Sequence, residues 1–383
     1  MLLTRLCVFV ILGFYLLTGC AQSNEQDHIY NTLQGIDIGM TINPHKALDS
    51  LNKIEYQHFN RGNLYYYYLL RSIGRERCHI EDKEDSLLLL SEEWYKDKSD
   101  HRNLIRCILY KGVIRYNSYK LDSLAQQNIY EAKSIYDKYH IYDPATETIL
   151  YKYLGKIKRI KNQLNEAEKD LNHGLQICMR IKDSNETQQI RYELFYTTLS
   201  QKKISLALSY IQPYINNNTT NLVEIYEKNE ALYYYFTAKQ EYNRANHFLK
   251  ELSKIPKYSE FNMIDMSSIY YRISLNFKNL GLIDSSIYYC IRAVESVDST
   301  NSSSVHAYYK FLAELSSIKG DISTAYAYYK KAYYSYIKSF SKITSNQALA
   351  IKTKYNKSEQ KLIQVREKNH LYLIIIFFVV FFS

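Results

Sequence analysis

The chain contains little proline and little glycine, with only 4 and 11 of them among 383 residues. A chain this poor in turn-forming residues is atypical of β-rich proteins and of disordered, low-complexity segments. No alternation of apolar and polar residues is long enough to predict a useful strand. The hydrophobic share is 46%, which is enough for a large core. These features predict an all-α chain.

Sequence motifs that carry catalytic or metal chemistry are also missing. The six cysteines form no CxxC pair, and the ten histidines show neither an HExxH motif nor metal-ligand spacing. The sequence has no GxxxxGK or GxSxG motif, and glycine is too sparse to form a phosphate-binding loop. We therefore expect no enzymatic activity, no metal and no cofactor.

The net charge of +10 raises the question of an acidic partner. Lysine and arginine are spread among aspartate and glutamate instead of forming a basic arm, so we expect no direct binding of nucleic acid. Tyrosine is unusually frequent, with 41 residues. This residue suits half-buried helix faces, where the ring packs and the hydroxyl reaches water.

One phrase recurs along the chain. It reads GLIDSSIYYCIRA at Gly281–Ala293, GDISTAYAYYKKA at 320–332 and NQLNEAEKDLNHG at 162–174. Each copy has a turn, a small residue, a packing residue four positions later and another small residue three after that. The first small residue recurs at spacings of 38 to 42, at Ala47, Ser86, Ala125, Ala167, Ala207, Ala245, Ser286 and Ala325. Such a steady period predicts a solenoid of stacked helix pairs.

The repeated units resemble the tetratricopeptide repeat (TPR) family over roughly residues 40–340. Residues 151–174, 270–293 and 309–332 carry large and small residues at the offsets of the family signature. The resemblance implies a right-handed superhelical solenoid of about eight helix pairs, all-α. The period is near 40 instead of about 34, so longer helices or connections are expected, and a HEAT-like array is the alternative.

The resemblance also implies a ligand groove on the first helix of each pair, helix A, which lines the inner face of such arrays. We expect this groove to be basic towards its front and aromatic behind, which would suit a peptide or protein partner that carries a carboxylate. The alternative is that these are ordinary solvated helix positions. The candidate groove residues are Arg71, Arg75, Lys152, Lys156, Arg159, Tyr192, Tyr196, Tyr234, Tyr271 and Lys278.

The amino terminus predicts export and lipid attachment. Residues 1–19 read as a signal peptide, with Arg5 before an apolar run at Leu6–Leu17. The run ends in Leu-Thr-Gly-Cys, which resembles a bacterial lipobox with Cys20 as the lipidated residue; the alternative is an ordinary signal peptide with an incidental cysteine. We expect a tether over 20–39, the repeat array over 40–336, and anchoring to the inner or outer membrane of a Gram-negative bacterium, facing the periplasm. In such a compartment a Cys78–Cys107 disulfide is compatible with the spacing but is not required by it.

The carboxyl terminus predicts a helical neck over 337–370, with a weak coiled-coil pattern, and then an apolar segment over 371–383. The twelve apolar residues of LYLIIIFFVVFF span about 18 Å as a helix, short of a hydrocarbon core of about 30 Å, so they resemble part of a transmembrane helix.

Two main functions follow from this layout. The first is a lipid-anchored scaffold that binds a peptide or protein in its concave groove. The alternative is the sensor part of a membrane signal transducer or transcriptional regulator, truncated at its transmembrane helix and lacking the cytoplasmic output domain, because the layout resembles membrane-tethered TPR sensors. A third, a glycan-binding lipoprotein, would be expected to carry more tryptophan than Trp94 alone.

Overall fold

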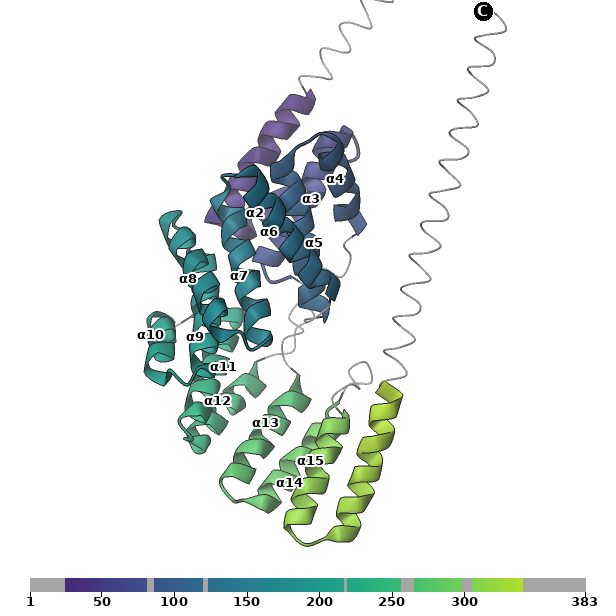
Figure 1. The fold of residues 1–383 in the computed structure, drawn as a ribbon, viewed down its shortest axis with the longest axis vertical. Helices are drawn as coiled ribbons and strands as arrows, with labels where there is room; N and C mark the ends of the chain where they lie inside the picture. Colours follow the sequence, from purple (N-terminus) through teal and green to yellow (C-terminus); the bar gives the residue numbers. More distant parts are fainter. Residues whose placement is uncertain are drawn as a thin grey trace, which may run out of the picture. The chain divides into compact units, whose positions relative to one another are not determined.

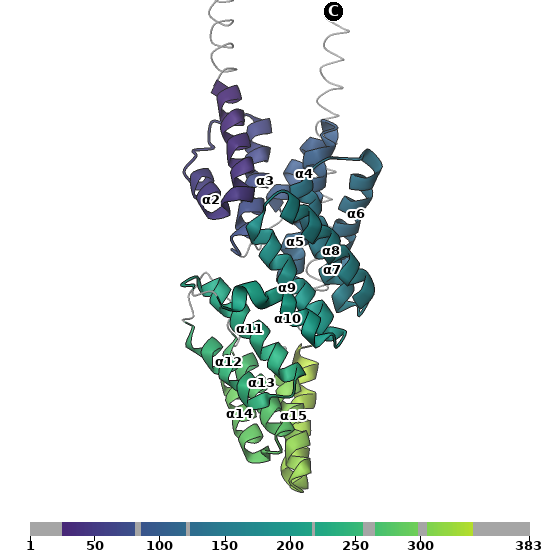
Figure 2. The ribbon, with the colours of Figure 1, turned by 90° about the vertical axis from the view of Figure 1, so that its left-hand side faces the viewer.

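A computed structural model describes residues 25–80, 86–119, 123–216, 219–255, 265–297 and 305–339. Throughout these ranges the chain forms helices and turns and no strand, which confirms the all-α prediction (Figures 1 and 2). The predicted signal peptide, Cys20, most of the neck and the apolar segment 371–383 lie outside the described residues. Within the described ranges, no helix is both long enough and apolar enough to cross a membrane.

The described helices fall into two compact units. The first unit holds a helix over residues 25–42 followed by α2 (Pro44–Asn52), α3 (Arg61–Arg77), α4 (Ser86–Asp97), α5 (His101–Tyr119), α6 (Ser123–Tyr139), α7 (Pro144–Ile160), α8 (Leu164–Arg180), α9 (Ser184–Ser200), α10 (Ile204–Ile215) and α11 (Leu222–Ala238). The second unit holds α12 (Tyr242–Lys254), α13 (Met266–Asn279), α14 (Ile283–Glu295), α15 (Val305–Ile318) and a helix over residues 322–339.

Consecutive helices pair as antiparallel hairpins inside each unit. In the first unit α5 packs on α6, α7 on α8 and α9 on α10; in the second, α13 packs on α14. Helix α7 also contacts α9, so the first helices of successive pairs form a row (Figure 2). We call these first helices the A helices and their partners the B helices. This arrangement confirms the predicted solenoid of tetratricopeptide-like helix pairs.

Small residues sit where an A helix meets its B helix. The predicted anchors Ala125, Ala167, Ala207 and Ser286 are fully buried in such pairs, and the predicted anchor Ala245 on α12 is fully buried as well. A Cβ atom added to Gly155 on α7 would lie only 2.5 Å from Leu171 Cγ and 3.3 Å from the Ala167 carbonyl oxygen on α8. The pairing therefore depends on a missing side chain on one helix and a small one on the other.

One predicted anchor is wrong. Ser86 is exposed at the first residue of α4, and the small buried residue of that helix is Ser91. The Ser91 hydroxyl donates to the Tyr65 carbonyl on α3 at 3.2 Å, so α3 and α4 approach each other there. The predicted spacing does not hold in the α3–α4 pair, because the small residue lies five positions later than an even spacing requires.

The turns between A and B helices share one backbone conformation. Several A helices are followed by a residue with positive φ: Asn162 (60°) after α7, Lys202 (63°) after α9, Gly281 (76°) after α13 and Gly320 (81°) after α15. The next N–H then bonds back across the last turn, as from Gln163 to the Lys158 carbonyl at 2.9 Å. This satisfies carbonyls that the helix end leaves free, and glycine adopts the conformation without strain.

The residues just before the array differ from the predicted tether. Residues 25–42 form a helix in which Leu33, Ile36 and Met40 are buried. Their spacing of three and four places them on one face, which packs into the core of the first unit. Part of the segment assigned to the tether over 20–39 is therefore a packed helix.

Candidate functional site

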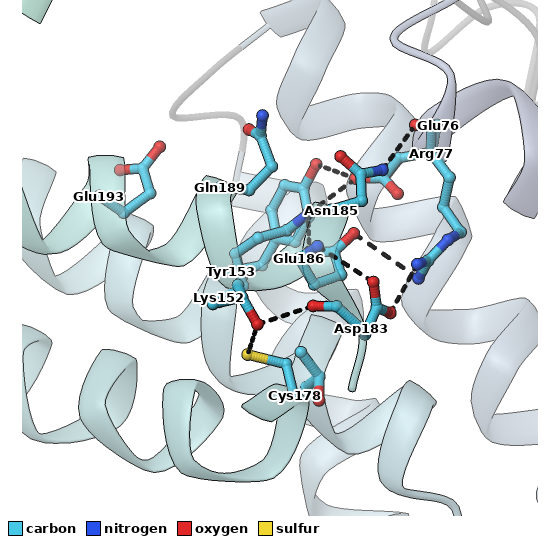
Figure 3. A network of polar contacts seen from close by, with 12 residues as sticks. Glu76, Arg77, Lys152, Tyr153, Cys178, Asp183, Asn185, Glu186, Gln189 and Glu193 are labelled. Atoms are coloured by element: carbon cyan, nitrogen blue, oxygen red, sulfur yellow. Dashed lines mark hydrogen bonds and ion pairs between the residues drawn. The ribbon is translucent and has the colours of Figure 1, made fainter. Parts of the chain in front are cut away.

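The A helices of the first unit bring ionised side chains together in a buried network (Figure 3). Lys152 of α7 lies 2.8 Å from Glu186 of α9 and 3.2 Å from Glu76 of α3. Arg77 lies 2.6 Å from Asp183, which caps the start of α9. These five side chains come from α3, α7 and the start of α9, so the network connects three repeats, and the first of them is separated from the other two in sequence by the α5–α6 pair.

Burial makes these pairs strongly interdependent. The side chains of Lys152, Glu76 and Glu186 are 6%, 8% and 2% exposed. Burial alone would lower the pKa of Lys152, but Glu186 and Glu76 outweigh that effect and raise it. The lysine is therefore a charged structural element that neutralises two carboxylates, and it cannot also bind an external anion.

A second, more accessible group of charges continues along the same row of helices. Glu193 of α9 accepts from Arg159 at 2.8 Å and pairs with Lys156 at 3.2 Å, both on α7. Burial alone would raise the pKa of Glu193, but Lys156 and Arg159 outweigh it and lower the value to about 2. The carboxylate therefore stays ionised at any physiological pH.

Aromatic rings and further carboxylates extend this group to α11. The Arg159 guanidinium lies 5.7 Å from the Tyr196 ring, and Tyr196 packs edge-on against Tyr234 at 5.6 Å. The Tyr196 hydroxyl donates to Glu230 at 3.4 Å, and the Gln189 amide donates to Glu227 at 2.7 Å. We call this group the helix-A surface; its members are Lys156, Arg159, Gln189, Glu193, Tyr196, Glu227, Glu230 and Tyr234.

The sequence predicted free basic residues at the front of the groove, but the structure shows these residues in ion pairs. Lys152, Lys156 and Arg159 do lie on the A-helix row, but each is paired with a glutamate. The helix-A surface has two cations and three carboxylates, so it is acidic rather than basic. The physical reason is that stacking A helices buries lysine and arginine stems, and a buried cation requires an opposite charge nearby.

Four of the ten predicted groove residues belong to the helix-A surface: Lys156, Arg159, Tyr196 and Tyr234. Four others of the first unit do not belong to it. Lys152 is in the buried network, Tyr192 is buried against Tyr214 of α10, and Arg71 and Arg75 are half-buried on α3. Tyr271 and Lys278 belong to the second unit.

The two residues of the second unit have their own packing roles. Tyr271 packs against Tyr308 and Phe311 of α15, with ring centroids 4.8 and 5.4 Å apart. The Lys278 ammonium lies 5.0 Å from the Phe311 ring and 3.6 Å from Glu314. Both side chains therefore contribute to the contact of α13 with α15.

Sequence reasoning missed Gln189, Glu193, Glu227 and Glu230. A signal for the last two was present, because Glu227, Glu230 and Tyr234 are spaced by three and four residues and so share one helix face. Glu193 likewise lies three residues before Tyr196. Searching each A helix for carboxylates on the same face as the predicted tyrosines would have identified all three, although not the cations with which they pair.

Glu227 makes a pH-dependent contribution to the free energy of unfolding, and this contribution can be measured. Burial is the main cause of a pKa raised to about 7, with repulsion from Glu193 adding to it and hydrogen bonds from Gln189 and Gln188 opposing it. A carboxyl whose pKa is raised by folding stabilises the protein fully below its ordinary pKa and loses that contribution as pH rises through 7. We expect Glu227→Gln to be more stable than the wild type at pH 8 and to lose the advantage by pH 4.5.

The measurement is urea unfolding of both proteins across this range. His79 titrates in the same range with the opposite sign, because burial lowers its pKa to about 4, but it is present in both proteins and cancels in the difference. A difference in unfolding free energy that does not change with pH would contradict the assignment to Glu227.

The described residues contain no cluster of His, Cys, Asp or Glu that could hold a metal ion. Cys78, Cys107, Cys178 and Cys290 are buried and free, so the Cys78–Cys107 disulfide is not formed. Burial raises the pKa of the Cys78 thiol to about 11 and that of Cys290 to about 12. These thiols pack as small hydrophobic groups.

The helix pairs, the turns between them and the row of A helices define a helical-repeat protein of the tetratricopeptide type. No family model and no curated protein sequence matches the chain. It is similar to a Rap protein complexed with competence and sporulation factor, with a TM-score of 0.57 and 12% identity over 82% of this chain and 98% of that chain. It is also similar to the apo form of the quorum sensor NprR from B. thuringiensis, with a TM-score of 0.53 and 10% identity over the same shares.

A third similar structure is a signal transduction ATPase with a tetratricopeptide repeat sensor from Pyrococcus horikoshii. Its TM-score is 0.50 and its identity 14%, over 85% of this chain and 49% of that chain. At these identities the likeness establishes the fold. The chain has the fold of tetratricopeptide repeat proteins.

Proposed function

We propose that the chain is a non-enzymatic scaffold that binds a peptide or protein through the helix-A surface. The observation that carries the proposal is the continuity of this surface across α7, α9 and α11. Arg159, Tyr196 and Tyr234 contact one another in series, with Glu227 and Glu230 beside them. A peptide that lies along such a row meets aromatic rings for its apolar side chains and carboxylates for its donors.

The charge of the helix-A surface indicates which kind of peptide it can bind. Lys156 and Arg159 are both paired with Glu193, and Glu227 and Glu230 add two further carboxylates, so the fully ionised surface carries a formal charge of −1. A peptide with lysine, arginine or exposed backbone N–H groups therefore suits the surface better than the acidic peptide expected from sequence. Two similar structures support a peptide ligand by analogy, since one is described as a quorum sensor and the other holds competence and sporulation factor.

The test is selection of a phage-displayed random peptide library on the full chain in detergent. We expect selected peptides to bind Tyr234→Ala at least about tenfold more weakly, equivalent to about 1.4 kcal/mol, because the variant removes the ring that continues the row. Glu230→Gln, which keeps the side-chain shape, is expected to weaken lysine-containing and arginine-containing peptides selectively.

The matched control is Tyr142→Ala. Tyr142 is 84% exposed between α6 and α7 and is not part of the helix-A surface. Its loss is expected to leave binding unchanged. Selected peptides that bind Tyr234→Ala and Glu230→Gln as tightly as the wild type would contradict the proposal.

We further propose that lipid on Cys20 anchors this scaffold to a bacterial membrane, with the array facing the periplasm. The lipobox-like sequence directly after an apolar run supports this.

Cys20→Ala is expected to move the protein from the membrane fraction to the soluble fraction, because stable anchoring requires the acyl chains. The measurement is fractionation of cells that express either chain, beside a version ending at Asn369. Retention of Cys20→Ala, followed by release on removal of residues 370–383, would assign the anchor to the apolar segment and favour the membrane-transducer alternative.

A further inference from the structure

A cavity of about 270 Å³ lies in the first unit, apart from the helix-A surface. It is formed where the start of the helix 25–42, the starts of α3 and α5, and the end of α4 meet. Four aromatic side chains line it: Tyr30, Tyr66, Tyr95 and Trp94. The other lining residues are Gln26, Asp27, Asn60, Gly62, Asn63, Asp100 and Asn103.

The amide side chains of the cavity are already occupied by one another. Asn63 Nδ2 donates to the Gln26 carbonyl at 2.9 Å and to its Oε1 at 3.0 Å, and the Asn60 N–H donates to the same Oε1 at 2.9 Å. Asn103 Nδ2 donates to Asp100 at 2.8 Å. These bonds make the amides a rigid frame, so they are poorly placed to bind the hydroxyls of a sugar.

Tyr95 adds a hydroxyl to the lining, and its side chain is 5% exposed. A hydroxyl can donate or accept a hydrogen bond, so it can contact a polar group of a ligand that lies against the rings. This hydroxyl and the aromatic rings are therefore the groups of the cavity that can contact a ligand.

The charge of the cavity excludes anions. Asp27 and Asp100 line it and no lysine or arginine does, although the whole chain carries +10. The helix N-termini that would attract an anion are capped, since Asn60 accepts from the Asn63 N–H at 2.8 Å and Asp100 accepts from the Asn103 N–H at 3.1 Å. Aromatic faces and carboxylates together attract cations.

We propose that this cavity binds an organic ammonium group. The rings of Tyr30, Tyr66 and Trp94 would surround the cation, Asp27 and Asp100 would balance its charge, and the Tyr95 hydroxyl would accept from it. The Trp94 ring already has a cation near it within the chain, because the Lys98 ammonium lies 5.0 Å from its centroid. The inference does not depend on peptide binding at the helix-A surface.

Trp94 provides the measurement, because it is the only tryptophan of the chain. Its fluorescence in the full chain is titrated at constant ionic strength with choline, ethylammonium, diglycine amide and N-acetyl-diglycine amide. We expect a saturable change with the first three and none with the acetylated peptide, which lacks the ammonium. A response to choline and ethylammonium alone would assign the cavity to small free amines, and a stronger response to diglycine amide would assign it to peptide amino termini.

Two variants separate binding from folding. Tyr95→Phe keeps the packed ring and removes only the hydroxyl, and Asp27→Asn removes an exposed charge, so both should keep a Tm near that of the wild type. Each is expected to weaken ethylammonium binding by about two- to fivefold, as for a partly exposed charge contact. Asp49→Asn on α2, outside the cavity, is the control. No saturable change with any ammonium, an equal response to the neutral carbon isostere of choline, or wild-type affinity in both variants would overturn the proposal.

Discussion

Lys152→Met is expected to destabilise the first unit by about 3–5 kcal/mol. The substitution leaves Glu76 and Glu186 buried without the cation that neutralises them, and an uncompensated buried charge is costly. Methionine keeps the length of the side chain, so lost packing contributes little. The measurement is urea unfolding followed by the fluorescence of Trp94, which lies in the same unit.

Lys133→Met is the matched control for this prediction. Lys133 forms an ion pair with Asp137 one turn later on α6, and the aspartate side chain is 59% exposed. Such a surface pair is worth about 0.2–1 kcal/mol at most. Equal effects of the two substitutions would show that the network around Lys152 is solvated and does not hold the repeats together.

Gly155→Ala is expected to destabilise the same unit by about 1–3 kcal/mol. The new Cβ would lie 2.5 Å from Leu171 Cγ and 2.8 Å from its Cδ2, so α7 and α8 would have to separate or Leu171 would have to leave its rotamer. Alanine is otherwise the better helix former, so local propensity predicts the opposite sign. The sign of the change therefore decides whether the close approach of the two helices is real.

Gly35→Ala supplies the comparison, because it is the same substitution in an open position. Gly35 lies inside the helix 25–42, and an added Cβ would meet nothing within 4 Å. We expect this variant to gain about 0.5–1 kcal/mol from helix propensity alone. Thermal unfolding of the two variants beside the wild type gives both values; stabilisation by Gly155→Ala would contradict the packing described for α7 and α8.

Much of the fold follows from the period of small residues. Ala125, Ala167, Ala207, Ala245 and Ser286 were predicted from spacing alone, and each is fully buried at a helix contact. The spacing works because a helix pair can approach closely only where side chains are small, so the constraint recurs once in each repeat. It failed at Ser86, where the true contact is at Ser91 and the even period no longer holds.

The character of the candidate site could not be predicted in the same way. Sequence reasoning placed Lys152, Lys156 and Arg159 on the A-helix row but assigned them to a free basic surface. Their partners come from other repeats: Glu186 and Glu193 lie 34 positions or more along the chain, and Glu76 lies 76 positions before Lys152. Whether a cation is free or paired depends on which repeats contact each other, and a single helix carries no signal for that.

The pairing changes the function that the site suggests. Its two cations are both paired with Glu193, and the helix-A surface also carries the carboxylates Glu227 and Glu230 beside Tyr196 and Tyr234. Glu227 titrates near neutrality, so the charge that a ligand meets depends on pH. We expect a cationic peptide to bind more tightly at pH 8 than at pH 6, since the ionised carboxylate is the better partner.

The most direct test of peptide binding through the helix-A surface is amide hydrogen exchange on the full chain, with and without a peptide from the library selection. If the peptide binds this surface, amide exchange is expected to slow in α7, α9 and α11 when the peptide is bound, with little change in their partners α8 and α10. Protection confined to α8 and α10, or to the hairpin turns, would place the ligand on another face and contradict the account.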